Sequence, residues 1–131
     1  MSISARDKFE IQEVITRMYQ ALDAHDAEGY ASYFTPDGIS TSPRGDFRGR
    51  NAITNFIKRH LQQGNEDDSL HRIANIHIWE DIEHEASASV QVMKFRVSVT
   101  PPVFLVSAFG TARMKKFETW QILYYELGHR P

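Results

Sequence analysis

The two halves of this sequence have different hydrophobic periodicities. Through most of residues 4–64, apolar side chains recur every three or four positions, which is typical of amphipathic helices. Residues 70–127 are instead rich in β-branched and aromatic side chains, which are typical of strands. Helices that come first and strands that come last favour an α+β fold over an alternating α/β fold. We therefore expect three N-terminal helices packed on a mixed or antiparallel sheet.

The first helix is predicted to begin at Ser4, whose side chain can form a capping box with Asp7. A second helix should open at Asp26 as its N-cap and end where Thr35-Pro36-Asp37-Gly38 supplies turn chemistry. A third should begin at Gly49 and end at Gly64. The apolar faces of the three helices are, in order, Ile11, Val14, Ile15, Met18, Tyr19 and Leu22; Ala27, Tyr30, Ala31 and Phe34; and Ala52, Ile53, Phe56, Ile57, His60 and Leu61. We interpret residues 39–47, which contain two further turn signals, as short extended pieces rather than a full strand.

The second half is predicted to form four long strands joined by short connections, which favours an antiparallel meander. These strands are residues 70–79, 86–99, 103–116 and 120–127. The two middle strands carry apolar side chains on both faces, more than helices on one face would cover. A second covering surface is therefore expected, and a sheet-to-sheet contact in a homodimer, or a higher homo-oligomer, is the simplest way to supply it.

Composition excludes several classes of function. The 131 residues are expected to form one domain, residues 1–131, with a single core. A net charge of -2 without runs of one sign speaks against a nucleic-acid or membrane-surface partner. The absence of cysteine excludes disulfides and thiolate chemistry. No segment has the pattern of a signal peptide or a membrane span, so we expect a cytoplasmic protein.

Asp23 is the first candidate for chemistry. It follows Tyr19 by four residues and Ile15 by eight, so it projects beside the apolar stripe of the first helix instead of toward solvent. It also falls in the last turn, where the helix dipole disfavours negative charge, and burial there would raise its pKa toward a range useful for proton transfer. The alternative is a capping role at the turn between the first two helices, as expected for Asp26.

His71 is the second candidate, at the start of the first long strand. Strand alternation places it on one face with Ile73 and Asn75, and Ile73 indicates that this face points inward. His77 and Trp79 continue the same phase unless a bulge intervenes. An inward histidine with a carboxylate partner could exchange protons at neutral pH; the alternative is a core histidine bonded to a backbone carbonyl.

The remaining histidines and the tyrosines look less informative. His25, His60, His84 and His129 fall at turns, a helix boundary and the terminus, and no spacing among the histidines predicts a metal site. No nucleotide-binding glycine motif occurs, so no cofactor is expected. The tyrosines fall mostly at core or strand positions, where packing is their commoner role, although one or two could line a pocket.

Several segments together resemble the SnoaL-like domains of the nuclear-transport-factor-2-like superfamily. They are residues 21–26 and 30–38, residues 47–53 at the start of the third helix, residues 71–75 in the first strand and residues 120–122 in the last. The resemblance covers nearly the whole chain and implies a cone-shaped α+β barrel around an internal pocket for a small apolar or aromatic organic molecule. Within that superfamily the sequence is most similar to scytalone dehydratase-like proteins.

The resemblance also implies a site. In scytalone dehydratase-like proteins, an aspartate at the end of the first helix and a histidine that opens the long strand form a hydrogen-bonded pair, and Asp23 and His71 occupy those positions. The pattern departs in two places: residues 93–100 offer no second histidine, and residues 39–42 offer no tyrosine. The expected activity is that of a cofactor-independent dehydratase or isomerase in which Asp23 and His71 transfer a proton.

Further residues and alternatives complete these expectations. Tyr19, Tyr33 or Asn75 are candidates to bind the developing oxyanion, and Ile73 to line the pocket. The main alternative is a non-catalytic protein that binds a small ligand or acts as an association subunit, as the β subunits of ring-hydroxylating dioxygenases do. An epoxide hydrolase has less support, because it needs additional paired carboxylates that the sequence does not place in the pocket.

Overall fold

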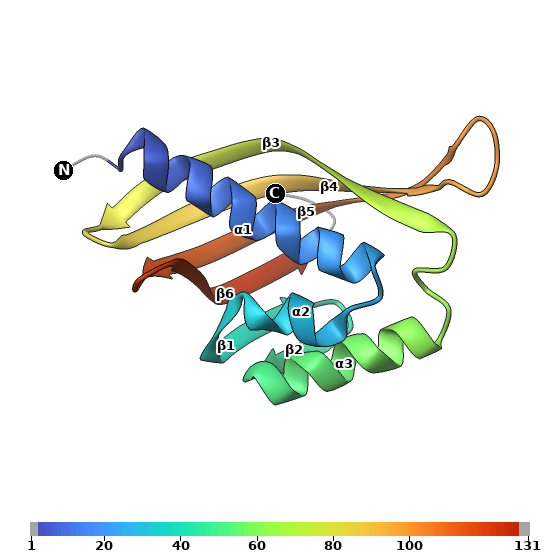
Figure 1. Cartoon of the computed structure of the whole chain (residues 1–131), viewed down its shortest axis with the longest axis horizontal. Helices are drawn as coiled ribbons and strands as arrows, with labels where there is room; N and C mark the ends of the chain where they lie inside the picture. The colour runs from blue at the N-terminus through green and yellow to red at the C-terminus, as the bar shows by residue number, and fades with distance from the viewer. Residues whose placement is uncertain (1–2, 129–131) are drawn as a thin grey trace.

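The computed structural model describes residues 3–128, which form three helices on one face of a curved six-stranded sheet (Figure 1). The helices are α1 (Ala5–Asp23), α2 (Ala27–Ser32) and α3 (Arg50–Gln62). The strands are β1 (Phe34–Ser42), β2 (Gly45–Arg48), β3 (Ser69–Ile82), β4 (Glu85–Arg96), β5 (Val103–Lys116) and β6 (Trp120–Gly128). The α+β architecture predicted from the sequence is thus confirmed. None of these helices has the length and hydropathy needed to cross a bilayer.

The sheet has the strand order β2-β1-β6-β5-β4-β3 and does not close on itself. Strands β3 to β6 form the predicted antiparallel meander, but β1 pairs with β6 in parallel, so the sheet is mixed. The segment read as short extended pieces is in fact a hairpin of β1 and β2. Two further boundaries differ from prediction: α2 ends at Ser32, so that the buried Phe34 begins β1, and β3 continues through Ile82 before a turn at Glu83 and His84.

The ends of α1 follow from local chemistry. Ser4 Oγ accepts a hydrogen bond from the backbone N–H of Asp7 at 3.0 Å, as the predicted N-cap requires. The Asp7 carboxylate also accepts hydrogen bonds from Lys116 Nζ and Trp120 Nε1, so the start of the helix is tied to β5 and β6. Asp26 caps α2 by accepting from the N–H of Gly29 at 2.9 Å. On the other side of the turn, the backbone N–H groups of Ala24 and Asp26 donate to carbonyls in the last turn of α1.

The core lies between α1 and the concave face of the sheet. Its fully buried side chains include Ile11, Ile15 and Met18 from α1, and Val90, Met114 and Ile122 from the sheet. The strands contribute small residues such as Ala88 and Ala112 opposite the helix, which lets α1 approach the sheet closely. Toward the C-terminal end of α1 the packing is looser, and a cavity remains between α1, α3 and the ends of the strands.

A bulge in β3 reverses the phase of that strand. The register with β4 shifts between Ala74 and His77, and Asn75 adopts a left-handed backbone with φ of 53°. Because the bulge adds one residue, Ile76 and Ile78 pack toward the core, whereas Trp79 is 38% exposed and stacks on the exposed His77. The inward phase of His77 and Trp79, expected only in the absence of a bulge, therefore does not apply.

Candidate functional site

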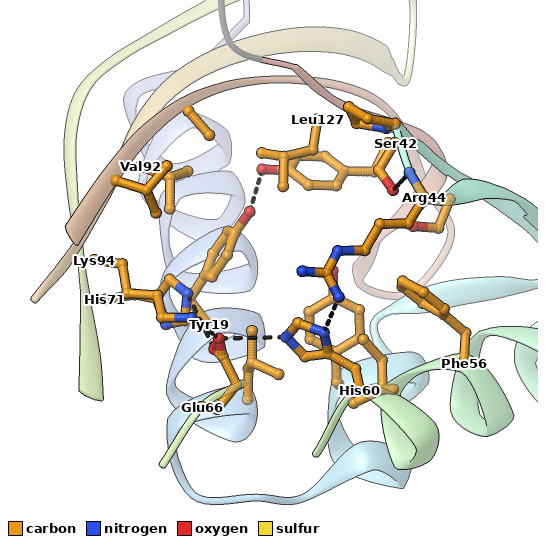
Figure 2. Close-up of a pocket in the computed structure, with 18 of the residues that line it drawn as sticks. Tyr19, Ser42, Arg44, Phe56, His60, Glu66, His71, Val92, Lys94 and Leu127 are labelled. Atoms are coloured by element: carbon orange, nitrogen blue, oxygen red, sulfur yellow. Dashed lines mark hydrogen bonds and ion pairs between the residues drawn. The ribbon is translucent and has the colours of Figure 1, made fainter. Parts of the chain in front are cut away.

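The cavity has a volume of about 290 Å³, and its wall extends from α1 and α3 to the β1–β2 turn and the end of β6. That volume lies at the lower end of the range of about 300–1,000 Å³ typical of small-molecule sites. Its wall combines apolar side chains with a compact set of titratable groups, which Figure 2 shows converging on the space. The polar members of the wall are Tyr19, Tyr30, Ser40, Ser42, Arg44, His60, Glu66, His71, Lys94 and Tyr125.

Asp23 and His71 lie in direct contact at one side of this cavity. Nδ1 of His71 is 2.6 Å from Oδ1 of Asp23, and the backbone N–H of His71 donates to the same carboxylate at 3.1 Å. Strand β3 is an edge of the sheet, so an N–H on its open side is available to a partner outside the sheet. A carboxylate can only accept, so Nδ1 carries a proton and the neutral ring presents the lone pair of Nε2.

Nε2 of His71 faces a second carboxylate, that of Glu66. The distance between Nε2 and Glu66 Oε2 is 3.6 Å, which is an ion-pair separation but too long for a hydrogen bond. Glu66 is only 2% exposed, and its Oε2 has no hydrogen-bond donor within the described residues. His71 therefore lies between two carboxylates: Asp23 is hydrogen-bonded to Nδ1, and Glu66 faces Nε2 without a hydrogen bond.

Glu66 stays ionised despite its burial. Burial by itself would raise the pKa of Glu66, but the hydrogen bonds from His60 and Lys94, the charge of His71 in its protonated form and the charge of Lys94 outweigh it and hold the pKa below its ordinary 4.5. Lys94 Nζ lies 2.7 Å from Glu66 Oε1 and also donates to the carbonyl of Asn65. The result is a buried anion with a matched cation.

His60 contacts the same carboxylate from the third helix. Its Nε2 lies 3.3 Å from Glu66 Oε1, while its Nδ1 faces two donors, Arg44 Nη1 at 2.9 Å and Asn65 Nδ2 at 3.3 Å. Because neither donor can accept at these atoms, Nδ1 carries the lone pair and the proton is on Nε2. His60 was judged uninformative from sequence, and the structure shows instead that it lines the cavity.

Two buried tyrosines, one of them beside His71, form another part of the cavity wall. The hydroxyl oxygens of Tyr19 and Tyr125 lie 2.6 Å apart, and burial is the main reason that the pKa of each is raised, so both keep their protons. Two hydroxyl groups carry two protons and only one is used between them. One O–H therefore remains available to donate to a ligand.

The structure does not bring all of the sequence-predicted residues to the cavity. Tyr19 lines it, but Tyr33 is half-buried at the C-cap of α2 and lies outside its wall. Ile73 packs against the core and lines a shallow groove behind Asp23. Asn75 is the bulge residue, and its exposed side chain donates to Gln91 Oε1 at 3.1 Å. The inward direction predicted for Asn75 is therefore wrong.

Sequence reasoning missed Glu66, His60, Lys94 and Arg44. A signal existed for His60, which follows Phe56 by four residues on the apolar face of α3, and for Lys94, which shares the inward phase of Val90 and Val92. Glu66 follows α3 in an irregular segment without periodicity, and Arg44 is in a turn. For these two residues no pattern in the sequence indicates burial or direction. The described residues contain no group of His, Asp or Glu arranged to hold a metal ion.

The fold is that of the cystatin-like and nuclear-transport-factor-2-like proteins. A protein of Nostoc punctiforme with a cystatin-like fold superposes with a TM-score of 0.88 at 22% identity, over 100% of this chain and 96% of that one. A nuclear-transport-factor-2-like protein of Novosphingobium aromaticivorans gives 0.82 at 20% identity, over 93% and 80%. ActVI-ORFA of Streptomyces coelicolor gives 0.82 at 20% identity, over 93% and 96%.

The sequence identifies the family within that fold. Residues 4–125 match the SnoaL-like domain, so the chain belongs to the SnoaL-like domain family. A search of curated proteins by sequence gave no significant match. SnoaL-like domains bind small molecules, and the chemistry of this one must be argued from the side chains of the cavity.

Proposed function

We propose that this protein is a cofactor-independent dehydratase or isomerase in which His71, oriented by Asp23, removes a proton from a carbon next to a carbonyl group. The single observation that supports this most is the 2.6 Å contact between Asp23 Oδ1 and His71 Nδ1. This contact supports the tautomer with a basic Nε2, on a histidine that lines the cavity beside Glu66.

The proton and the electrons have defined destinations in this scheme. The C–H bond breaks, its proton goes to His71 Nε2, and its electron pair forms an enolate. The imidazolium that results lies between the carboxylates of Asp23 and Glu66, which stabilise its charge. The O–H left over from the Tyr19–Tyr125 pair can donate to the enolate oxygen. The enolate then either expels a β-hydroxyl group, which leaves as water with the proton, or takes the proton back at another carbon.

The test is hydrogen–deuterium exchange of 2-tetralone in D2O, followed by proton NMR. This two-ring ketone has activated C–H bonds beside its carbonyl, so proton removal is measured without knowledge of the natural substrate. The wild-type protein is expected to accelerate the exchange, and Asp23→Asn and His71→Ala should each reduce that acceleration by roughly 10²-fold or more. His77→Ala is the matched control, because His77 lies on the outer face of the sheet.

The main alternative, a non-catalytic binding or association subunit, gives a different result. In that case, the wild-type protein would bind a ligand but accelerate exchange no more than the two variants do. Equal rates for wild type, Asp23→Asn and His71→Ala would therefore rule out the proton-transfer proposal. Circular dichroism of each variant ensures that a lost rate does not reflect a lost fold.

We also propose that a second copy of this chain covers the exposed apolar part of the β4–β5 hairpin. In Figure 1 this hairpin extends beyond the body of the molecule, past the helices. Its exposed side chains are Val97, Val99, Val103, Phe104, Leu105 and Val106. An exposed apolar surface of this kind favours association. In a two-fold dimer, the same surface of each copy covers that of the other. Light scattering should give the mass of a dimer, and Phe104→Glu should shift it to that of a monomer; a wild-type monomer would contradict the proposal.

A further inference from the structure

The charges in the cavity wall are not balanced. The wall carries two permanent cations, Lys94 and Arg44, and one carboxylate, that of Glu66. Lys94 and Glu66 match each other at 2.7 Å. Within residues 3–128, no carboxylate lies within ion-pair distance of the Arg44 guanidinium. The positive charge of Arg44, an exposed residue at the mouth-side wall of the cavity, therefore has no carboxylate partner within these residues.

Arg44 is held toward the interior of the cavity by a weak partner. It stands in the turn between β1 and β2, and Figure 2 shows its side chain reaching into the cavity on the side opposite His71 and Lys94. Its Nη1 donates to Nδ1 of His60 at 2.9 Å. A neutral imidazole is a poorer partner for a guanidinium than a carboxylate, which can accept two parallel N–H bonds.

We infer that the substrate of this site is a small organic carboxylate whose carboxylate group binds Arg44. A ligand held there extends across the cavity toward Nε2 of His71. Its body packs against the apolar wall, which includes Phe56, Val92 and Leu127. This inference rests on the proposed function for the role of His71 and adds the recognition of the substrate at the opposite end.

His60 keeps a partner when the ligand takes over Arg44. The Nδ2 of Asn65 lies 3.3 Å from the same Nδ1 of His60, so the ring does not lose its only donor. The Nε2–H of His60 stays directed at Glu66 Oε1. When the Arg44 guanidinium leaves His60 to bind a ligand carboxylate, Nδ1 of His60 still has a donor. Binding therefore does not carry the free-energy cost of an unpaired acceptor.

The test compares 2-naphthoate with 2-naphthamide, which has nearly the same shape but no charge, by isothermal titration calorimetry. Wild-type protein should bind 2-naphthoate about tenfold or more tightly than 2-naphthamide, because the charged pair is stronger than a neutral one. Arg44→Met should abolish this preference. Arg44→Lys should keep part of it, since the charge stays but the paired N–H geometry is lost.

Arg48→Met is the matched control. Arg48 is an exposed residue of the neighbouring β2, it lies outside the cavity wall, and its replacement removes the same charge. This variant should keep the wild-type preference. Three results would each overturn the inference: no binding of 2-naphthoate at millimolar concentration, equal affinities of wild type for the two probes, or a preference that survives in Arg44→Met.

The binding test and the exchange test distinguish failure of the carboxylate site from failure of the proton-transfer role. A preference for 2-naphthoate that depends on Arg44, together with no acceleration of 2-tetralone exchange, supports the carboxylate site and rejects the proton-transfer role. Acceleration of exchange that depends on Asp23, together with equal binding of the two naphthyl probes, supports the proton-transfer role and rejects the carboxylate site.

Discussion

The carboxylate of Asp23 accepts two hydrogen bonds from one residue, His71: one from ring Nδ1 at 2.6 Å and one from the backbone N–H at 3.1 Å. Both bonds join the last residue of α1 to the start of β3. They therefore link two residues that are 48 positions apart in the sequence. The contact has a structural consequence that is separate from any role in catalysis.

We expect Asp23→Ala to lower the free energy of unfolding by about 1–3 kcal/mol, because two partly buried donors of His71 lose their acceptor. Asp23→Asn should cost less, since its amide oxygen can still accept one of the two bonds. Urea denaturation followed by circular dichroism measures both. Asp67→Ala removes an exposed carboxylate and should change stability by less than about 0.5 kcal/mol. Equal stability of wild type and Asp23→Ala would mean that the contact contributes nothing to folding.

Gly110 makes room for the hydroxyl group of Tyr125. A Cβ added at Gly110 would lie 2.2 Å from Tyr125 Oη and 2.8 Å from Cζ, and the Tyr125 ring is fully buried. Gly110→Ala should therefore destabilise the protein by about 1–3 kcal/mol through overpacking. Tyr125→Phe in the same chain removes the closest atom, so the double variant should recover part of the loss in urea denaturation. A fully stable Gly110→Ala would show that the ring can move aside freely.

Lys94 and Glu66 form the buried ion pair of the cavity. Lys94→Met should cost about 3–5 kcal/mol at neutral pH, because it leaves the carboxylate of Glu66 without its main cation. The double variant Lys94→Met/Glu66→Gln should be less destabilised than the sum of the single variants, with a coupling of about 1–3 kcal/mol. The four unfolding free energies form a double-mutant cycle, and a coupling of zero would contradict the pairing.

The same pair predicts a pH dependence. The folded pKa of Glu66 is lowered from 4.5, so its contribution to stability is present above that pH and is lost as the pH falls through the folded pKa. Lys94→Met removes one cause of that lowering. The difference in unfolding free energy between wild type and Lys94→Met should therefore narrow as the pH is lowered below 4.5. A difference that stays constant down to pH 3 would argue against the stabilisation of ionised Glu66 by Lys94.

Asp7 should give a second, smaller pH effect at the start of α1. Hydrogen bonds from Trp120 and Lys116 are the main causes that lower the pKa of Asp7 from 3.8 to about 2. Its stabilising effect is thus fully present above pH 3.8 and is lost as the pH falls through the folded pKa of about 2. Asp7→Asn should cost about 1 kcal/mol at pH 6, since solvent screens this partly exposed site. The cost should vanish only below about pH 2, where the folded carboxyl is protonated as well. Glu10→Gln, which breaks an exposed ion pair with Arg6, serves as the control.

The bulge residue Asn75 should tolerate glycine but not valine. Its φ of 53° lies in the left-handed region, which a β-branched side chain adopts only at a cost of order 1–3 kcal/mol. Asn75→Val should lower the melting temperature, whereas Asn75→Gly should stay near wild type. His77→Val is a control in the regular, exposed part of the same strand. A melting temperature for Asn75→Val equal to that of wild type would mean that the bulge relocates.

Much of the fold could be predicted because its signals are local. The capping pair of Ser4 and Asp7 and the apolar stripe from Ile11 to Leu22 marked α1 within a residue or so of its true ends. The four long strands were marked by β-branched and aromatic side chains. Asp23 stood out for a local reason as well, being a carboxylate beside an apolar helix face.

The predicted positions of Asn75 and Tyr33 were wrong because contacts with distant parts of the chain decided them. Strict alternation from His71 would put Asn75 inside, but the bulge at Asn75 lets β3 bend along β4 and turns the following residues over. Tyr33 has the composition of a pocket residue, yet α2 ends before it and leaves it outside the cavity wall. Asparagine adopts the left-handed backbone more readily than most residues, but its presence in a strand does not by itself predict a bulge.

The sequence by itself therefore determined the helices and the long strands, because capping, periodicity and side-chain preference act over a few residues. The family followed from the resemblance of several segments taken together. Tertiary structure decided the composition of the site. Glu66, Lys94, His60 and Arg44 come from a loop, a strand, a helix and a turn, and only the folded chain brings them to one cavity with Asp23 and His71 at its side. The physical reason is that a buried charge needs partners, and these partners are distant in sequence but adjacent once the sheet curves around α1.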